Sequence, residues 1–143
     1  MKFSYLLLFN LLVTHLYSQE VISFKSSNPF GFRDVITNLE NLQDQEVEAI
    51  LKLPKGKGPF PLIIGVAGSL DWGPHHLEYL QMFRESRMAT LELQSFSSRG
   101  VKSTVGSQIE VTTATMVLDA YRALDRISTH PDIDKDRVAI MGW

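Results

Sequence analysis

The sequence has no cysteine among its 143 residues. This absence excludes disulfide bonds, thiolate metal sites and a cysteine nucleophile within this stretch. It does not identify the cellular compartment, because secreted proteins without cysteine are common. An excess of charge of one sign is also missing, since 14 Lys and Arg residues against 16 Asp and Glu residues leave a net charge of −2. Nucleic-acid binding usually needs a clustered basic face, so we expect no nucleic-acid partner.

The remaining composition is that of an ordinary globular protein. Hydrophobic residues make up 44% of the chain and charged residues 21%, which excludes a disordered chain. A chain of this length forms one domain at most, and it is long enough to bury a sizeable core.

The N-terminus has the layout of a secretory signal peptide. Lys2 supplies a positive start, residues 3–16 are almost all apolar, and Ser18 is a small residue suited to the position before a cleavage site. The apolar run is shorter than the ~20 residues of a membrane-spanning helix. We therefore prefer a cleaved signal peptide over residues 1–18 to a membrane anchor or a buried helix. This predicts a secreted or periplasmic protein with no stable membrane anchor, whose mature chain begins near Gln19.

After the signal peptide, the hydrophobic pattern divides the chain into two parts. Residues 19–45 are weakly patterned and are predicted to form an irregular leader, with one short helix within 34–42. From residue 46 onward, apolar residues alternate, run continuously, or recur at steps of three and four. This pattern predicts strands over 46–53, 62–66, 88–93 and 138–141, and helices over 75–87 and 110–128. Strands that alternate with helices indicate an α/β fold, with a mostly parallel sheet and helices on both faces.

The last strand closes on a glycine, which is typical of the nucleophile elbow of an α/β-hydrolase. In the elbow Gly-x-Ser-x-Gly, a buried strand enters a sharp turn that holds up the nucleophile. Gly142 is the first glycine of this pattern and Trp143 is the x residue. The nucleophile would be the next residue, which lies outside the chain. Trp143 has two open interpretations, since it would either line the acyl pocket or pack in the core.

The loops after the other strands hold the candidate binding residues. In an open parallel sheet, ligands bind beyond the carboxyl ends of the strands. α/β-Hydrolases take one oxyanion donor from the first βα loop. Gly68 would let the backbone approach a substrate there, and the oxyanion candidates are the backbone N–H groups of Ser69 and Leu70. The alternative is an ordinary turn from strand to helix.

The loop after the next strand adds two substrate-binding candidates, Gln94 and Arg99. The guanidinium fork of Arg99 would orient a substrate carboxylate, although an arginine that binds loop carbonyls is an equally open interpretation. On the long helix, Asp119 is placed on the polar side, in a surface pair with Arg122. His75 and His76 are interpreted as a solvated helix start, because adjacent helical residues do not face the same way.

Several segments together resemble the first half of the dienelactone hydrolase family. They occur in the family's order, and they are PLIIGVAGS at 61–69, QSFSSRG at 94–100, DAYRAL at 119–124, HPDID at 130–134 and RVAIMGW at 137–143. The resemblance implies an α/β-hydrolase fold, hydrolysis of esters or lactones, a nucleophile–His–Asp triad and no metal. Family members often carry His-Gly in the oxyanion loop, where this chain has Ala67-Gly68.

These observations predict an exported serine-type hydrolase whose N-terminal part occupies residues 46–143. The acid and the histidine follow the nucleophile in the chain order of this fold, so we expect no catalytic side chain within this sequence and no activity from it alone. The expected partner is a small-molecule ester or lactone, with no cofactor. The alternatives are a non-catalytic binding protein with the same fold, or another α/β-hydrolase such as a peptidase or an acetyl esterase. Whether the nucleophile is Ser or Cys stays open.

Overall fold

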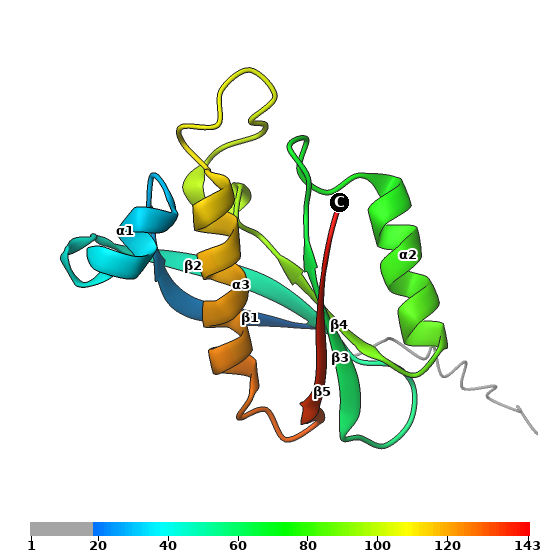
Figure 1. Ribbon diagram of the computed structural model, residues 1–143. Coiled ribbons are helices and arrows are strands. Elements are labelled where there is room, and N and C mark those ends of the chain that lie inside the picture. The colour runs from blue at the N-terminus through cyan, green and yellow to red at the C-terminus, as the bar shows by residue number, and fades with distance from the viewer. Residues whose placement is uncertain (1–18) are drawn as a thin grey trace, which may run out of the picture.

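The computed structural model describes residues 19–143, so the predicted signal peptide lies outside the described residues. The described residues form five strands and three α-helices, together with two short 3₁₀ helices, η1 and η2 (Figure 1). In chain order the elements are β1 Gln19–Ser27, α1 Phe32–Thr37, η1 Leu39–Asn41, β2 Asp44–Lys52, β3 Phe60–Val66, α2 Pro74–Glu85, β4 Ala89–Leu93, η2 Ser97–Arg99, α3 Thr113–Ile127 and β5 Ile133–Gly142.

All five strands belong to one sheet, in the order β1-β2-β4-β3-β5. β3 pairs in parallel with both β4 and β5, whereas β2 is antiparallel to its neighbours β1 and β4. Four strands therefore run in the same direction and only β2 opposes them. The expectation of a mostly parallel sheet is confirmed, with β2 as the strand that makes the sheet mixed.

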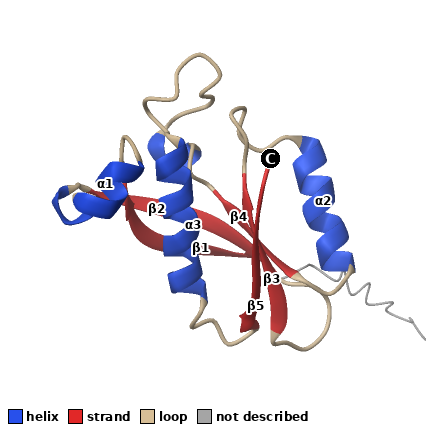
Figure 2. Ribbon diagram, viewed as in Figure 1, coloured by secondary structure: helices blue, strands red, loops and turns tan. Residues whose placement is uncertain are grey.

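Helices cover both faces of this sheet, as predicted (Figure 2). The main core lies between α3 and the sheet, where Leu62, Ile64 and Leu91 are fully buried in one cluster with Ala123 and Ile127 of α3. α2 lies against the opposite face. A Cβ atom added to Gly65 of β3 would lie 3.4 Å from a methyl group of Leu80 on α2, so a side chain at this position would crowd the helix.

The N-terminal strand β1 differs from the sequence prediction. The supposed irregular leader begins with nine strand residues that pair in register with all of β2. Ile22 and Phe24 point into the core, but the next inward position is Ser26 and the outward Val21 is 55% exposed. The alternation of apolar and polar residues is therefore blurred, which explains the missed strand. The short helix expected within 34–42 forms as α1 and η1.

The last strand is longer than predicted and lies at the edge of the sheet. β5 begins at Ile133 rather than Val138, and its register with β3 is interrupted between Phe60 and Leu62. Among the described residues β5 pairs only with β3, so its other side has no strand partner. Over residues 19–143, no helix is both long enough and apolar enough to span a membrane.

Candidate functional site

The first candidate segment is the turn after β3, which lies directly against the end of β5. A Cβ atom added to Gly68 would lie 2.8 Å from the carbonyl oxygen of Trp143. The Trp143 N–H also donates a hydrogen bond to the Val66 carbonyl, with an N···O distance of 3.3 Å. Only glycine fits position 68 without a shift of the backbone. The structure therefore places Gly68 against Trp143, while Gly142, the other predicted elbow residue, pairs with Val66 at the end of β3.

The turn is built on four residues, Gly68 to Asp71. The Asp71 N–H donates to the Gly68 carbonyl at 2.9 Å, which leaves Ser69 and Leu70 as the central residues of a β-turn. Over residues 19–143, neither the Ser69 N–H nor the Leu70 N–H makes a hydrogen bond. Both predicted oxyanion candidates are therefore free donors, one and two residues after Gly68, whose backbone contacts Trp143.

Asp71 closes the turn in a strained conformation. Its φ of 60° lies in the left-handed region, which Asp tolerates better than most residues. The carboxyl oxygen Oδ1 is buried and has no hydrogen-bond partner in the described part of the chain. Burial raises the pKa of the Asp71 carboxyl above its usual range.

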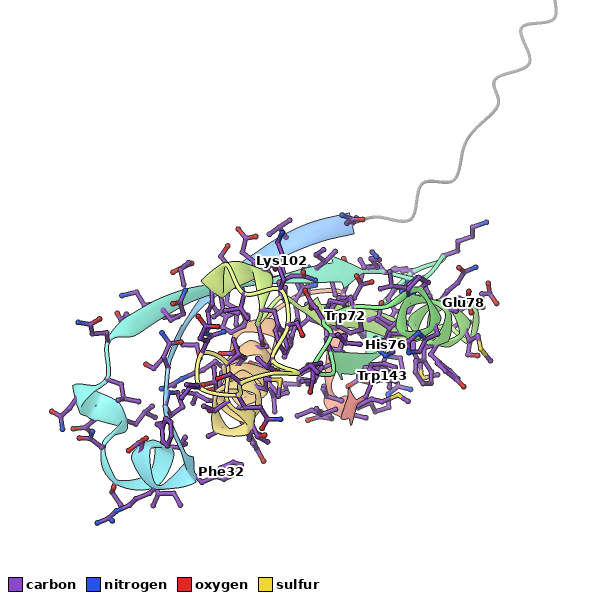
Figure 3. The ribbon with its side chains drawn as sticks, turned by 90° about the horizontal axis from the view of Figure 1, so that it is seen from above. Phe32, Trp72, His76, Glu78, Lys102 and Trp143 are labelled. Atoms are coloured by element: carbon purple, nitrogen blue, oxygen red, sulfur yellow. The ribbon has the colours of Figure 1, made fainter. Side chains whose placement is uncertain are left out.

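Three aromatic side chains pack together beside the elbow, as Figure 3 shows for Trp72, His76 and Trp143. The ring centroid of Trp143 lies 5.6 Å from that of Trp72 and 5.2 Å from that of His76. The Trp72 indole N–H donates to the Leu93 carbonyl at 2.8 Å, which fixes the cluster to the end of β4.

His76 is not the solvated residue that the sequence indicated, since its side chain is buried in this cluster. Its Nδ1 accepts a hydrogen bond from the Gly73 N–H at 3.0 Å, at the start of α2. Burial of the ring and the neighbouring His75 lower the pKa of His76. A histidine that accepts a backbone hydrogen bond and packs on tryptophan is neutral, and here it caps the helix. The interpretation as a solvated helix start is therefore wrong for His76.

An apolar cavity opens on the other side of the elbow, between α3 and the end of β5. Its volume is about 390 Å³. The lining residues are Val66, Ala67, Thr113, Met116, Val117, Ala120, Tyr121, Ile140, Gly142 and Trp143. No charged side chain is among them. Trp143 therefore both packs against Trp72 and lines a pocket, so the two interpretations of this residue do not exclude each other.

Arg99 is fully engaged with neighbouring protein groups. All five of its N–H donors are occupied, by the Asn28 side chain at 2.6 Å, the Ser95 and Ser27 carbonyls at 2.8 and 3.2 Å, and both Asp119 carboxylate oxygens at 2.8 and 3.0 Å. No N–H remains for a substrate carboxylate. The geometry favours the alternative interpretation, in which Arg99 binds loop carbonyls.

The carboxylate partner of Arg99 is Asp119, which the sequence placed on the protein surface. Asp119 is completely buried, and it also accepts a hydrogen bond from the Ser26 hydroxyl at 2.5 Å. The expected surface pair of Asp119 with Arg122 is therefore wrong. The buried pair joins β1, the loop after β4 and α3, which explains why a carboxylate is tolerated in the interior.

The backbone and the side chain of Gln94 also make hydrogen bonds to nearby protein groups. Its backbone N–H donates to the Glu48 carbonyl at 3.0 Å, and its side-chain oxygen accepts from the Ser97 hydroxyl at 3.2 Å. Of the predicted site residues, Gly68, Ser69, Leu70, Gly142 and Trp143 form one group, whereas Gln94 and Arg99 are held by other contacts. Over residues 19–143, no three His, Asp or Glu side chains are grouped as metal ligands would be.

Comparisons with known proteins support the fold of the whole described region. No protein-family profile matches the chain, and no curated protein matches it either. Among solved structures, a dienelactone hydrolase from Klebsiella pneumoniae is 16% identical over 87% of this chain and 50% of its own, with a TM-score of 0.57. The protein m3DLH is 14% identical over 87% and 49%, also with a TM-score of 0.57. The esterase Est22 is 12% identical over 87% and 34%, with a TM-score of 0.53.

These likenesses show the fold, which is an incomplete α/β-hydrolase-type fold. The chain spans about half the length of the first two structures that it matches.

Proposed function

We propose that this chain is the N-terminal part of an exported ester hydrolase, whose nucleophile directly follows Trp143. The single observation that carries the proposal is the contact between Gly68 and the Trp143 carbonyl, beside a turn with two free N–H groups. A reacting carbonyl held at the residue after Trp143 would lie next to those donors. The longer protein that continues past Trp143 is called the complete hydrolase below.

The proposed reaction is acyl transfer through a covalent intermediate. The nucleophile attacks the ester carbonyl, the carbonyl oxygen becomes negatively charged, and N–H groups of the turn donate hydrogen bonds to it. The alcohol then leaves, and water releases the acyl group. In this fold the acid and histidine come later in the chain. His76 is not the base, because its Nδ1 already accepts the Gly73 N–H and its pKa is lowered.

The surroundings of the elbow support an uncharged ester or lactone as the substrate. The cavity beside Trp143 has an apolar lining, and the guanidinium of Arg99 has no free donor for a carboxylate. A pocket without a charged partner would leave a buried substrate carboxylate unpaired, which costs several kcal/mol. We expect p-nitrophenyl butyrate to be turned over faster than an ester that carries a carboxylate on its acyl chain.

The decisive experiment replaces the residue after Trp143 with Ala in the complete hydrolase. Turnover of p-nitrophenyl butyrate is expected to fall by at least ~10³-fold, because the nucleophile is lost. The control is the same substitution at the exposed Ser107, which is expected to change nothing. Full activity after loss of the residue that follows Trp143 would contradict the proposal. Export is tested separately, since the mature protein should begin near Gln19.

A binding protein without catalysis is the second candidate. It is favoured by one observation, namely that Ala67-Gly68 stands where the resembling family often carries His-Gly. Reading the sequence past Trp143 separates the two. Ser or Cys at the next position supports the enzyme, whereas Gly, Ala or a bulky residue supports the binder. A peptidase or an acetyl esterase would share the elbow, and peptide and acetyl-ester substrates would distinguish them.

A further inference from the structure

The peptide bond between Ser69 and Leu70 is held from one side only. Its carbonyl oxygen, on Ser69, accepts two hydrogen bonds from the loop before α3, one from the Thr104 N–H at 2.9 Å and one from the Ser103 hydroxyl at 3.1 Å. Its N–H, on Leu70, makes none among the described residues. A trans peptide is planar, so its C=O and N–H point in opposite directions.

The turn after β3 has a neighbouring segment on each side. The turn after β3 lies between the loop over 101–112 and the end of β5 (Figure 1). On one side Ser69 bonds to Thr104, and on the other side Gly68 contacts the Trp143 carbonyl. A peptide whose C=O is held toward Thr104 points its N–H away from the loop over 101–112.

The loop residues that bond to the Ser69 carbonyl are themselves held in place by burial and by a further hydrogen bond. Thr104 is buried although it lies in a loop. The Ser103 hydroxyl accepts a hydrogen bond from the Val105 N–H at 3.2 Å while it donates to the Ser69 carbonyl. Each hydrogen bond in such a chain polarises the next, so a doubly bonded carbonyl makes its own peptide N–H a stronger donor.

We propose that Ser103 and Thr104 form a clamp that orients and polarises the Leu70 N–H as the oxyanion donor. The inference rests on the proposed hydrolase function, and it selects Leu70 over Ser69. Ser103 acts through the Ser69–Leu70 peptide and does not touch the substrate, so it is a positioning residue. Thr104 contributes through its backbone, which leaves Ser103 as the side chain that substitution can test.

The test compares Ser103→Ala with Ser103→Thr and Ser107→Ala in the complete hydrolase. Ser107 lies in the same loop and is exposed, and no hydrogen bond of its side chain is among those of residues 19–143. For Ser103→Ala, kcat on p-nitrophenyl butyrate is expected to fall about five- to twenty-fold, a fraction of the loss of a whole oxyanion donor. KM is expected to stay within about two-fold, because the donor acts mainly in the transition state. The Thr variant keeps the hydroxyl and should recover most of the activity.

Two further readouts separate positioning from general damage. Binding of a trifluoromethyl ketone, which forms a tetrahedral oxyanion on the nucleophile, should weaken in parallel with kcat/KM. The thermal midpoint should fall by only a few degrees, since Ser103 is exposed and its two hydrogen bonds contribute little to the free energy of unfolding. Unchanged kcat in Ser103→Ala, or equal losses in Ser103→Ala and Ser107→Ala, would overturn the clamp while leaving the hydrolase proposal intact. A complete protein that hydrolyses no ester would overturn the proposed function, and the clamp with it.

Discussion

At the residue scale, the buried pair of Arg99 and Asp119 gives the sharpest stability prediction. Arg99→Lys keeps the positive charge but replaces five fixed donors with three on a flexible stem. Buried Asp119 and the carbonyls around it would lose hydrogen bonds that water cannot replace. We expect the free energy of unfolding to fall by about 2–4 kcal/mol, close to the cost of breaking a buried pair.

Urea unfolding of the complete hydrolase would measure this loss. The matched control is Arg137→Lys, because Arg137 pairs with Asp134 but its side chain is 60% exposed. An exposed pair of this kind is worth at most about 1 kcal/mol. Equal destabilisation by the two substitutions would contradict a special role for the buried pair.

The same pair explains why some site residues could not be predicted from sequence. The two partners of the Asp119 carboxylate are far from it in the chain, since Ser26 lies 93 positions before it and Arg99 lies 20 positions before it. A helical pattern places a charged residue on the outer face by default, and nothing local indicates the buried arginine. By contrast, the sequence indicated that candidate residues lie beyond the ends of β3 and β5, and Gly68 and Trp143 do lie together there, because parallel strands end at one edge.

At the scale of elements, the predictability of each strand and helix follows from how its residues are buried. β3 is a continuous apolar run and α3 has a clear stripe, so both were found to within a few residues. β1 was missed because its buried side includes Ser26. The hydroxyl of Ser26 donates a hydrogen bond to Asp119, a residue that comes close only in the folded chain. β5 was predicted too short, because its first half is the charged segment Asp134 to Arg137. Hydrophobic periodicity thus finds elements that bury apolar side chains, and it misses strand residues that bury polar side chains, as in β1, or that expose charged ones, as in β5.

The start of α2 gives a prediction on pH, because the cap depends on neutral His76. A proton on Nδ1 would break the hydrogen bond from the Gly73 N–H. The pKa of His76 is lowered from its ordinary 6.5 in the folded protein, so the unfolded chain binds a proton more readily. The free energy of unfolding should therefore be unaffected by this group above pH 6.5 and should decrease as the pH falls below it.

The comparison variant for this prediction is His76→Asn, whose side-chain oxygen can accept the same hydrogen bond and does not titrate. Urea midpoints measured between pH 7.5 and pH 5 should fall more steeply for the original protein than for the variant. The two curves should run parallel above pH 6.5. Parallel curves over the whole range would show that protonation of His76 is not linked to unfolding.

At the scale of the whole molecule, the sheet formed by residues 19–143 has an uncovered edge strand, β5. β5 lies at the edge of the sheet with no strand partner on its outer side, and Ile140 on it is 47% exposed. Unpaired backbone N–H and C=O groups next to apolar side chains are the usual origin of edge-to-edge association.

The described chain, residues 19–143, is therefore expected to associate as its concentration rises. Sedimentation velocity from about 5 to 100 μM should show a growing fraction of oligomers. Ile140→Lys places a charge beside the open edge and should reduce this fraction, since charged edge residues oppose strand pairing. Met82→Lys is the control, because Met82 is 59% exposed on α2, which packs on β3 and β4. A chain that stays monomeric throughout and unfolds in one sharp transition would contradict the prediction, since the edge would then be stable without a covering segment.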